Sequence, residues 1–174
     1  MRYRVWAAVA MVWLCACTLT NVQKKHVGHV AIPAGEGRMS GDIDLDLGDD
    51  FDTSDVGDGD IADISLTSFS LTATSEGTDV AFLERVDVYA EAPGLPKILV
   101  ASGESFPAGT HTAYLEPTDA DLTDYVLTRG FSVQTVVSGA MPSAETDLQV
   151  YVVVDVGVTP KGACNAIQGD YSGA

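Results

Sequence analysis

The densest group of residues that could do chemistry is an acidic stretch in the first third of the chain. Ten aspartates lie between Asp42 and Asp63, with Gly48, Gly57 and Gly59 among them. Carboxylate oxygens are the ligands that Ca²⁺ prefers, and glycines allow a loop to wrap around a cation. The calcium candidates in this stretch are Asp49, Asp50, Asp52, Asp55, Asp58 and Asp60.

An EF-hand loop does not fit this stretch, because it needs Gly at its sixth place and Glu at its twelfth. Counting from Asp42, those places hold Leu47 and Thr53. Counting from Asp50, they hold Asp55 and Ile61. Since the whole chain is acidic, with 25 acidic residues against nine basic ones, the sequence favours solvated loop charge. We predict no metal and no cofactor, with an irregular calcium loop as the alternative.

The three histidines do not form a metal or catalytic motif. His26 and His29 lie in a strand-like segment, and residues three apart on a strand point to opposite faces. His111 shares its parity with Ala113 and Leu115. We expect it to be a hydrogen-bonded residue at the boundary of the core.

Catalytic signatures are also absent from the sequence. No nucleophile motif accompanies His111 to complete a triad. There is no P-loop, dinucleotide glycine fingerprint, HExxH or pair of zinc-binding cysteines. With so many acids, a carboxylate pair at a glycosidase separation can arise by chance. We predict no catalytic residue, and we keep an envelope hydrolase acting on glycans or esters as the alternative.

The N-terminus carries the most specific pattern in the chain. Two arginines precede an apolar run from Val5 to Leu14, which is typical of a secretory signal. Residues 14–17, Leu-Cys-Ala-Cys, then place a leucine three positions before Cys17 and a small residue directly before it. This pattern resembles the lipobox of bacterial lipoproteins. Cys15 fits less well, because it would put Leu14 where a small residue is needed.

The resemblance implies that residues 1–16 are a removed signal peptide and that Cys17 carries lipid. A diacylglyceryl thioether and acyl chains such as palmitate are implied, and Thr18 after the cysteine implies sorting to the outer membrane of a Gram-negative bacterium. We expect residues 17–25 to be the lipidated N-terminus and tether. One alternative is a transmembrane anchor, but the apolar run has only half of the roughly 20 residues required. The other is cleavage without lipid, which would leave Cys17 free to pair with Cys164.

Composition limits the partners of the mature chain. Removal of residues 1–16 leaves 158 residues, a length that suits a single domain. These residues include seven basic and 25 acidic ones, a formal charge of −18. Such a surface repels phosphates, so we predict no nucleic-acid partner. Anionic lipid surfaces are repelled as well, so membrane attachment is expected through the lipid on Cys17. An envelope protein or glycan is the expected partner.

Apolar alternation predicts strands along most of the mature chain. It is longest from Leu148 to Val158, which predicts the centre of a sheet. The buried parity changes between Ile64 and Phe69, which predicts a β-bulge near residues 67–68. Residues 92–95, Ala-Pro-Gly-Leu, predict a type II turn within a hairpin.

A helix is predicted over residues 119–129, capped by Thr118 or Asp119, with Leu122, Tyr125 and Val126 on one face. About eight strands with this one helix predict an all-β, two-sheet antiparallel sandwich of immunoglobulin-like type over residues 26–160, followed by a tail over 161–174. The segment 80–125 resembles short uncharacterised bacterial lipoproteins with sandwich domains, a resemblance that implies no activity and no site residues.

These observations predict a lipid-anchored protein of the bacterial cell envelope with a non-enzymatic binding or structural role. A sugar-binding protein usually presents exposed aromatic side chains. Both tryptophans, Trp6 and Trp13, lie in the signal peptide. Tyr89, Tyr114 and Tyr151 are therefore the aromatic candidates.

Overall fold

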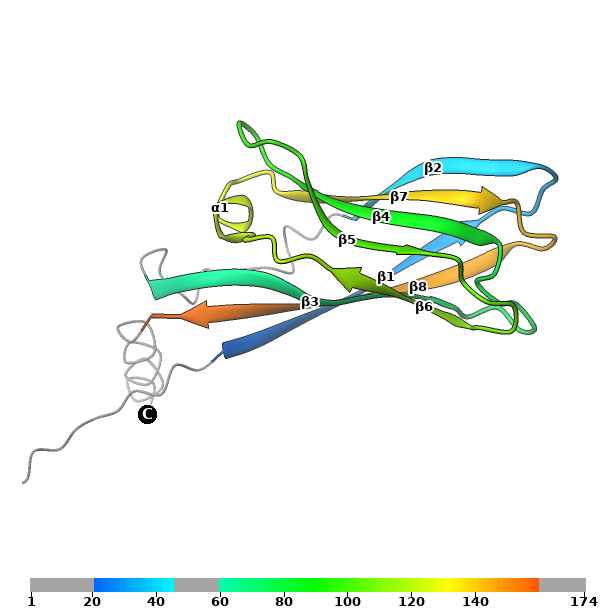
Figure 1. Cartoon of the computed structure of the whole chain (residues 1–174), viewed down its shortest axis with the longest axis horizontal. Helices are drawn as coiled ribbons and strands as arrows, with labels where there is room; N and C mark the ends of the chain where they lie inside the picture. The colour runs from blue at the N-terminus through cyan, green and yellow to red at the C-terminus, as the bar shows by residue number, and fades with distance from the viewer. Residues whose placement is uncertain (1–20, 46–59, 160–174) are drawn as a thin grey trace, which may run out of the picture.

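The structure is a computed structural model that describes residues 21–45 and 60–159 (Figure 1). These residues form eight strands and one short helix. In chain order the elements are β1 (Asn21–Ile32), β2 (Arg38–Leu45), β3 (Ile61–Ala73), β4 (Leu83–Glu91), β5 (Ile98–Glu104), β6 (Thr112–Pro117), α1 (Thr123–Val126), β7 (Ser132–Ala140) and β8 (Thr146–Val158). The predicted all-β class, with about eight antiparallel strands and a single helix, is confirmed for the described residues.

Hydrogen bonds join the strands into one curled sheet with the order β1-β8-β3-β6-β5-β4-β7-β2. The pairing is nested, because β1 pairs with β8, β2 with β7, β3 with β6 and β4 with β5. Three further pairings, β3 with β8, β4 with β7 and β5 with β6, join these hairpin arms into the sheet. The order therefore differs from the predicted immunoglobulin-like one. Alternation in the sequence identifies the buried face of a strand but not its partners.

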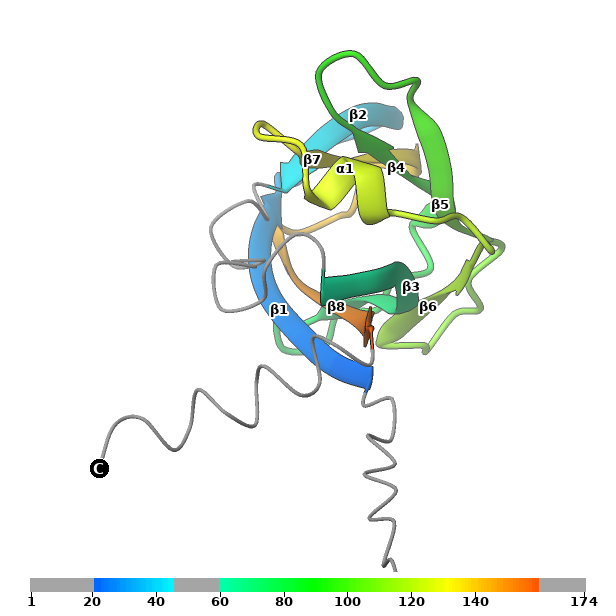
Figure 2. The ribbon, with the colours of Figure 1, turned by 90° about the vertical axis from the view of Figure 1, so that its left-hand side faces the viewer.

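The two halves of the sheet meet between β5 and β6, where only two residue pairs are in register. Ala101 lies opposite Pro117, and Ser102 lies opposite Glu116. Figure 2 shows β1, β8, β3 and β6 on one side of the interior and β2, β7, β4 and β5 on the other, with α1 between them at one end. The hydrogen bonds thus do not divide the strands into the two separate sheets predicted from the sequence.

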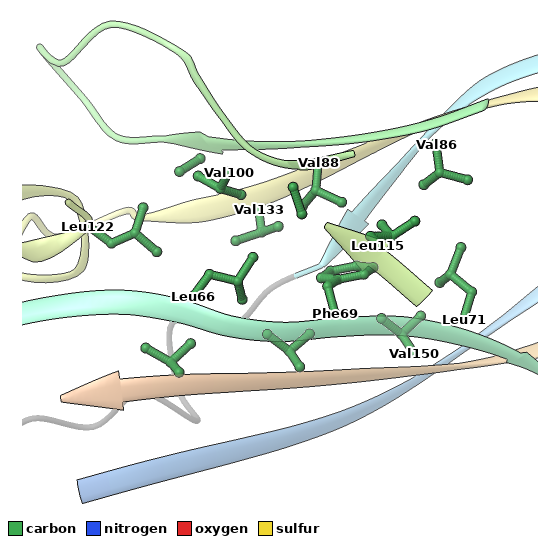
Figure 3. Packing of buried hydrophobic residues seen from close by; sticks show 14 of the residues in the cluster. Leu66, Phe69, Leu71, Val86, Val88, Val100, Leu115, Leu122, Val133 and Val150 are labelled. Atoms are coloured by element: carbon green, nitrogen blue, oxygen red, sulfur yellow. The ribbon is translucent and has the colours of Figure 1, made fainter. Parts of the chain in front are cut away.

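The core fills the space between these halves. Every second residue of β8 from Leu148 to Val158 is buried, as the alternation predicted. Phe69 and Leu71 of β3 point toward Val86 and Val88 of β4 across the interior (Figure 3). Full burial of an apolar side chain of this size contributes about 1.5–3 kcal/mol. β8 lies between β1 and β3, one strand in from the edge, so its predicted central position is wrong.

Two local predictions about the backbone are confirmed. The register of β3 against β8 shifts between Leu66 and Ser68, at the predicted bulge. In the connection between β4 and β5, the N–H of Leu95 donates to the carbonyl of Ala92 at 3.1 Å, and Gly94 has φ +84°. A positive φ at the third residue is the requirement of a type II turn, which glycine meets without strain.

The helix is much shorter than predicted. The sequence pattern extended over residues 119–129, whereas α1 spans only Thr123–Val126. Leu122 and Tyr125 are buried beside the core, as their spacing predicted. The hydroxyl of Tyr125 donates to the carbonyl of Pro96 at 2.6 Å. One turn is thus sufficient to place both apolar side chains.

The predicted cap at residues 118–119 is not used. Instead, Oδ1 of Asp121 accepts the backbone N–H of Thr123 at 2.9 Å. The N–H of Leu122 donates to the carbonyl of Ile64 on β3 at 2.8 Å. This bond joins the residue before α1 to a strand.

The first strand begins earlier than predicted. β1 starts at Asn21, so residues 21–25, which were assigned to the tether, pair with β8 from Asn21 opposite Gly157 to Lys25 opposite Val153. β1 is an edge strand of the sheet. It therefore has fewer apolar side chains than a central strand, and its sequence shows no strict alternation.

Candidate functional site

The outer surface of the half formed by β1, β8, β3 and β6 carries a row of side chains in cross-strand register. Val27 of β1 lies opposite Tyr151 of β8. Tyr151 in turn lies opposite Ser70 of β3, and Ser70 lies opposite Tyr114 of β6. One row of four residues thus crosses four strands. We call this row and the rows on either side of it the tyrosine face.

The members of the row differ in exposure. Tyr114 is 74% exposed and Val27 is 48% exposed, and these two are the exposed large hydrophobic residues of the described part of the chain. Tyr151 is half-buried. Ser70 is only 5% exposed although it faces outward, as expected for a small residue between two tyrosines. The row therefore has a small, buried side chain, Ser70, with a tyrosine on the strand at each side of it.

The adjacent rows of the tyrosine face are mostly uncharged and polar. One row consists of His29, Gln149, Thr72 and Thr112, and the other of Lys25, Val153 and Ser68. The hydroxyls of Thr72 and Thr112 lie 3.0 Å apart and are hydrogen-bonded.

No carboxylate occurs among the paired residues of the three rows, although Glu116 of β6 follows Leu115 and so lies beside Ser68 at the end of the third row. Carboxylates return just beyond them, at Asp147 and Asp155 on β8 and at Glu116 on β6. In a chain with 25 acidic residues, the centre of this face is neutral or weakly basic.

The outer surface of the other half carries paired charges instead. We call it the charged face, after Arg85, Asp87, Glu91, Lys97 and Glu104. Nε of Arg85 donates to Oδ2 of Asp87 at 2.7 Å, and Nη1 of Arg85 lies 3.9 Å from Oε2 of Glu104. The hydrogen bond to Asp87 raises the pKa of Arg85 above its ordinary value.

Tyr89 belongs to this charged face and is covered by Lys97. Nζ of Lys97 lies 4.8 Å from the centroid of the Tyr89 ring and 2.6 Å from a carboxylate oxygen of Glu91. The same ammonium group donates to Gln134 on β7. Tyr89 therefore has a structural cation–π partner, and it lies on β4, whereas Tyr114 and Tyr151 lie on β6 and β8.

An open groove runs over the outer side of β4, β5 and β6, where the two faces meet. Its lining includes Arg85, Asp87, Glu104, Phe106, Tyr114 and Glu116. Tyr114 is thus shared between the groove and the row. Within the groove, Arg85 neutralises two of the carboxylates by the contacts given above.

His111 lies in the loop before β6 and is exposed, not inward-facing as its parity suggested. Its Nδ1 lies 2.6 Å from the carbonyl of Thr78, so this nitrogen carries the proton and donates it. The expected hydrogen bond is therefore confirmed, whereas the expected position at the boundary of the core is wrong. Nearby, Asp79 accepts N–H bonds from Gly109 at 2.7 Å and Ala81 at 3.1 Å, which lower its pKa below the ordinary value of 3.8.

The predicted lipid and metal residues are almost all outside the described part of the chain. This applies to Cys17, Asp49, Asp50, Asp52, Asp55 and Asp58. Asp60 is described and is buried at the start of β3, where its carbonyl accepts the N–H of Thr159 at 2.7 Å. His26 and His29 lie in an unbroken register with β8 and so point to opposite faces, as predicted.

Residues 21–45 and 60–159 lack the features that would indicate a metal site or a membrane-spanning helix. No group of three or more His, Cys, Asp or Glu side chains there is arranged to hold a metal ion. No helix in the same ranges is long and apolar enough to cross a membrane.

Sequence reasoning selected three tyrosines, and the structure brings two of them together. Tyr114 and Tyr151 flank Ser70, whereas Tyr89 lies on the charged face. Sequence reasoning did not select Val27 and Ser70, because they join the tyrosines only through the register of the strands. The composition of the strands does not indicate this register.

Comparisons with known proteins give only a distant structural likeness. No family model and no curated protein matches the chain. Among solved structures, the chain is similar to the subject of "Crystal structure of decameric BFDV Capsid Protein", with 11% identity and a TM-score of 0.49. The match covers 81% of this chain and 99% of the capsid protein. A likeness at this level gives no information about function.

Proposed function

We propose that this chain is a lipid-anchored protein of the bacterial cell envelope that acts by binding a partner rather than by catalysis. The lipobox pattern around Cys17 supports the anchor and the outer-membrane location. Since β1 starts at Asn21, residues 18–20 alone separate the lipid from the sheet. Three residues span at most about 11 Å, so the domain would be held close to the bilayer.

The observation that carries the binding role is the tyrosine face. A row of Val27, Tyr151, Ser70 and Tyr114 ends in a tyrosine that is 74% exposed. Exposed aromatic side chains on a rigid sheet are common in binding surfaces, because they give large contact area at small entropic cost. With a net charge of −18 after signal removal, nucleic acid is not a proposed partner.

The same proposal treats the two halves of the sheet as the two layers of a sandwich. The nested pairing of β1 with β8 through β4 with β5 is the order of an eight-stranded jelly roll. Only the β5–β6 contact of two residue pairs joins the layers. In such a sandwich the tyrosine face and the charged face are the two outer surfaces.

An envelope hydrolase remains the second candidate, because one observation favours it. The groove beside Tyr114 holds Asp87, Glu104 and Glu116, and glycoside hydrolysis uses a pair of carboxylates. If this candidate is right, the purified protein releases reducing sugar from envelope glycans, and Glu104→Gln or Glu116→Gln stops the release while the fold survives. If turnover is absent, binding stands as the function.

The anchor is tested by the intact mass of protein extracted from membranes. We expect a mature chain beginning at Cys17 with the mass of attached lipid, and we expect Cys17→Ser to prevent processing. A water-soluble product without lipid mass would refute the anchor.

Calcium is kept as an alternative and no cofactor is proposed. A ligand that binds only the folded state at a hundredfold excess over its dissociation constant adds about 2.7 kcal/mol of stability. Because no cofactor is proposed, the thermal unfolding curves in calcium and in chelator should coincide. A higher melting temperature in calcium would point to the aspartates between Asp49 and Asp60.

A further inference from the structure

We propose that the tyrosine face binds a neutral glycan that lies across the strands, with sugar rings stacked on Tyr151 and Tyr114. This inference rests on the proposed binding function and names the class of its ligand. It excludes the charged face and the His111 loop from the binding site.

The spacing of the two tyrosines suits an extended ligand. Both lie in register with Ser70, one on each neighbouring strand. Two strand spacings amount to roughly 9–10 Å, so one sugar chain crossing the strands can reach both rings. Ser70 is small and buried, so nothing projects between the rings to block it. On the side of β1, the exposed Val27 extends the apolar contact.

The side chains of the face match the two kinds of surface that a sugar presents. The broad face of a pyranose carries C–H groups, which pack against the electron-rich face of a phenol ring. Its edges carry hydroxyls, which need donors and acceptors. Gln149, Thr72 and Thr112 lie in the row beside the tyrosines. Each threonine hydroxyl can make further hydrogen bonds besides the one that joins the pair.

The charge distribution selects a neutral ligand. The paired residues of the three rows include no carboxylate, and the nearest one on β6 is Glu116, two residues beyond Tyr114. A glycan that lies along the row of Val27, Tyr151, Ser70 and Tyr114 therefore meets no carboxylate within that row. The rest of the chain is strongly acidic, and its field repels phosphate and carboxylate groups. Lys25, at the exposed edge strand, is the single lysine of the three rows. Anionic glycans are therefore disfavoured, although their sugar rings could stack in the same way.

The experiment uses the full mature protein, extracted from membranes in neutral detergent. The probes are β-linked hexamers of glucose and of N-acetylglucosamine, with binding measured by calorimetry. We expect one of the hexamers to bind. Tyr114→Ala should weaken this binding about tenfold because one aromatic contact is lost, and Tyr114→Phe should retain it. Tyr151→Ala should also weaken it.

The matched control is Tyr89→Ala, which removes a tyrosine from the charged face. We expect it to leave hexamer binding unchanged, and circular dichroism would verify that every variant is folded. An equal loss in Tyr89→Ala and Tyr114→Ala would refute the location of the site.

Three other results would overturn the ligand class. The first is that neither hexamer binds while the protein binds an anionic polysaccharide through Tyr114. The second is that neither hexamer binds under any condition in which the protein is folded. The third is that the protein forms a dimer that Tyr114→Ala converts to monomers, which would make the face an interface between two copies. In each case the lipid anchor and the absence of turnover, tested separately, could still stand.

Discussion

The tyrosine face and the charged face are built on the same kind of strand but present different chemistry. Both cover one shared core, and both alternate outward polar residues with inward apolar ones. On the charged face, Arg85 and Lys97 are paired with carboxylates. On the tyrosine face, Tyr114 has no comparable cover and is 74% exposed. The difference is that ion pairs and a lysine cover the aromatic ring of the charged face, whereas the tyrosine face presents an exposed ring.

The largest expected effect tests whether the two faces depend on one core. Phe69 is 1% exposed and lies between the halves of the sheet. Phe69→Ala should reduce the free energy of unfolding by about 3–5 kcal/mol because it opens a cavity, and Phe69→Leu should have a smaller effect. Urea unfolding followed by circular dichroism measures both. Two separate transitions in the wild type would show that the faces have independent cores.

Gly139 and Gly157 lie in different halves of the sheet, and the cost of adding a side chain at each should differ. A side chain on Gly139 of β7 would overlap the carbonyl of Phe82 and the N–H of Glu84. A side chain on Gly157 of β8 would overlap only the carboxylate of Asp63, which can turn away. Gly139→Ala should therefore reduce the free energy of unfolding by about 1–3 kcal/mol, and Gly157→Ala should reduce it less. The reverse ranking in urea unfolding would contradict this prediction.

The stability of variants on the two faces should depend differently on salt concentration. Lys97→Met removes an exposed ion pair with Glu91 and should reduce stability by at most about 1 kcal/mol at low salt. The loss should shrink in 1 M salt because exposed charges are screened. Thr72→Val removes the hydrogen bond to Thr112 and should reduce stability by about 0.5–1.5 kcal/mol at either salt concentration. Equal salt dependence in both variants would contradict the comparison.

The smallest effect concerns pH and the loop that contains His111. Two N–H bonds, chiefly the one from Gly109, hold the pKa of Asp79 below 3.8. A depressed folded-state pKa stabilises the fold above the unfolded pKa, and this stabilisation is lost as pH falls from about 4 through the folded pKa. The stability difference between the wild type and Asp79→Asn should therefore narrow on acidification. A difference that stays constant from pH 6 to pH 2 would contradict it.

The sequence predicted features that depend on neighbouring residues. The bulge near Thr67 and the turn at Pro93-Gly94 follow from parity and from the conformational freedom of glycine, and both are present. The helix was predicted too long, because the spacing of Leu122 and Tyr125 is satisfied equally well by one turn. Local patterns also do not contain the bond that joins Leu122, directly before the helix, to β3.

Features that depend on partners distant in sequence were beyond prediction. The tyrosines could be named as candidates, but the grouping of Tyr114 with Tyr151 arises from the positions of β6, β3 and β8 in the sheet. The same is true of the strand order and of the early start of β1. Each is set by pairing between segments that alternation alone cannot match.

The nested pairing also constrains when the chain can fold. Asn21 pairs with Gly157, so the first strand has no partner until nearly the whole chain has emerged. Contacts of such long sequence separation make folding slow. Under the function proposed above, in which the chain is exported and lipidated near its N-terminus, this delay would keep the sheet open until after passage through the membrane.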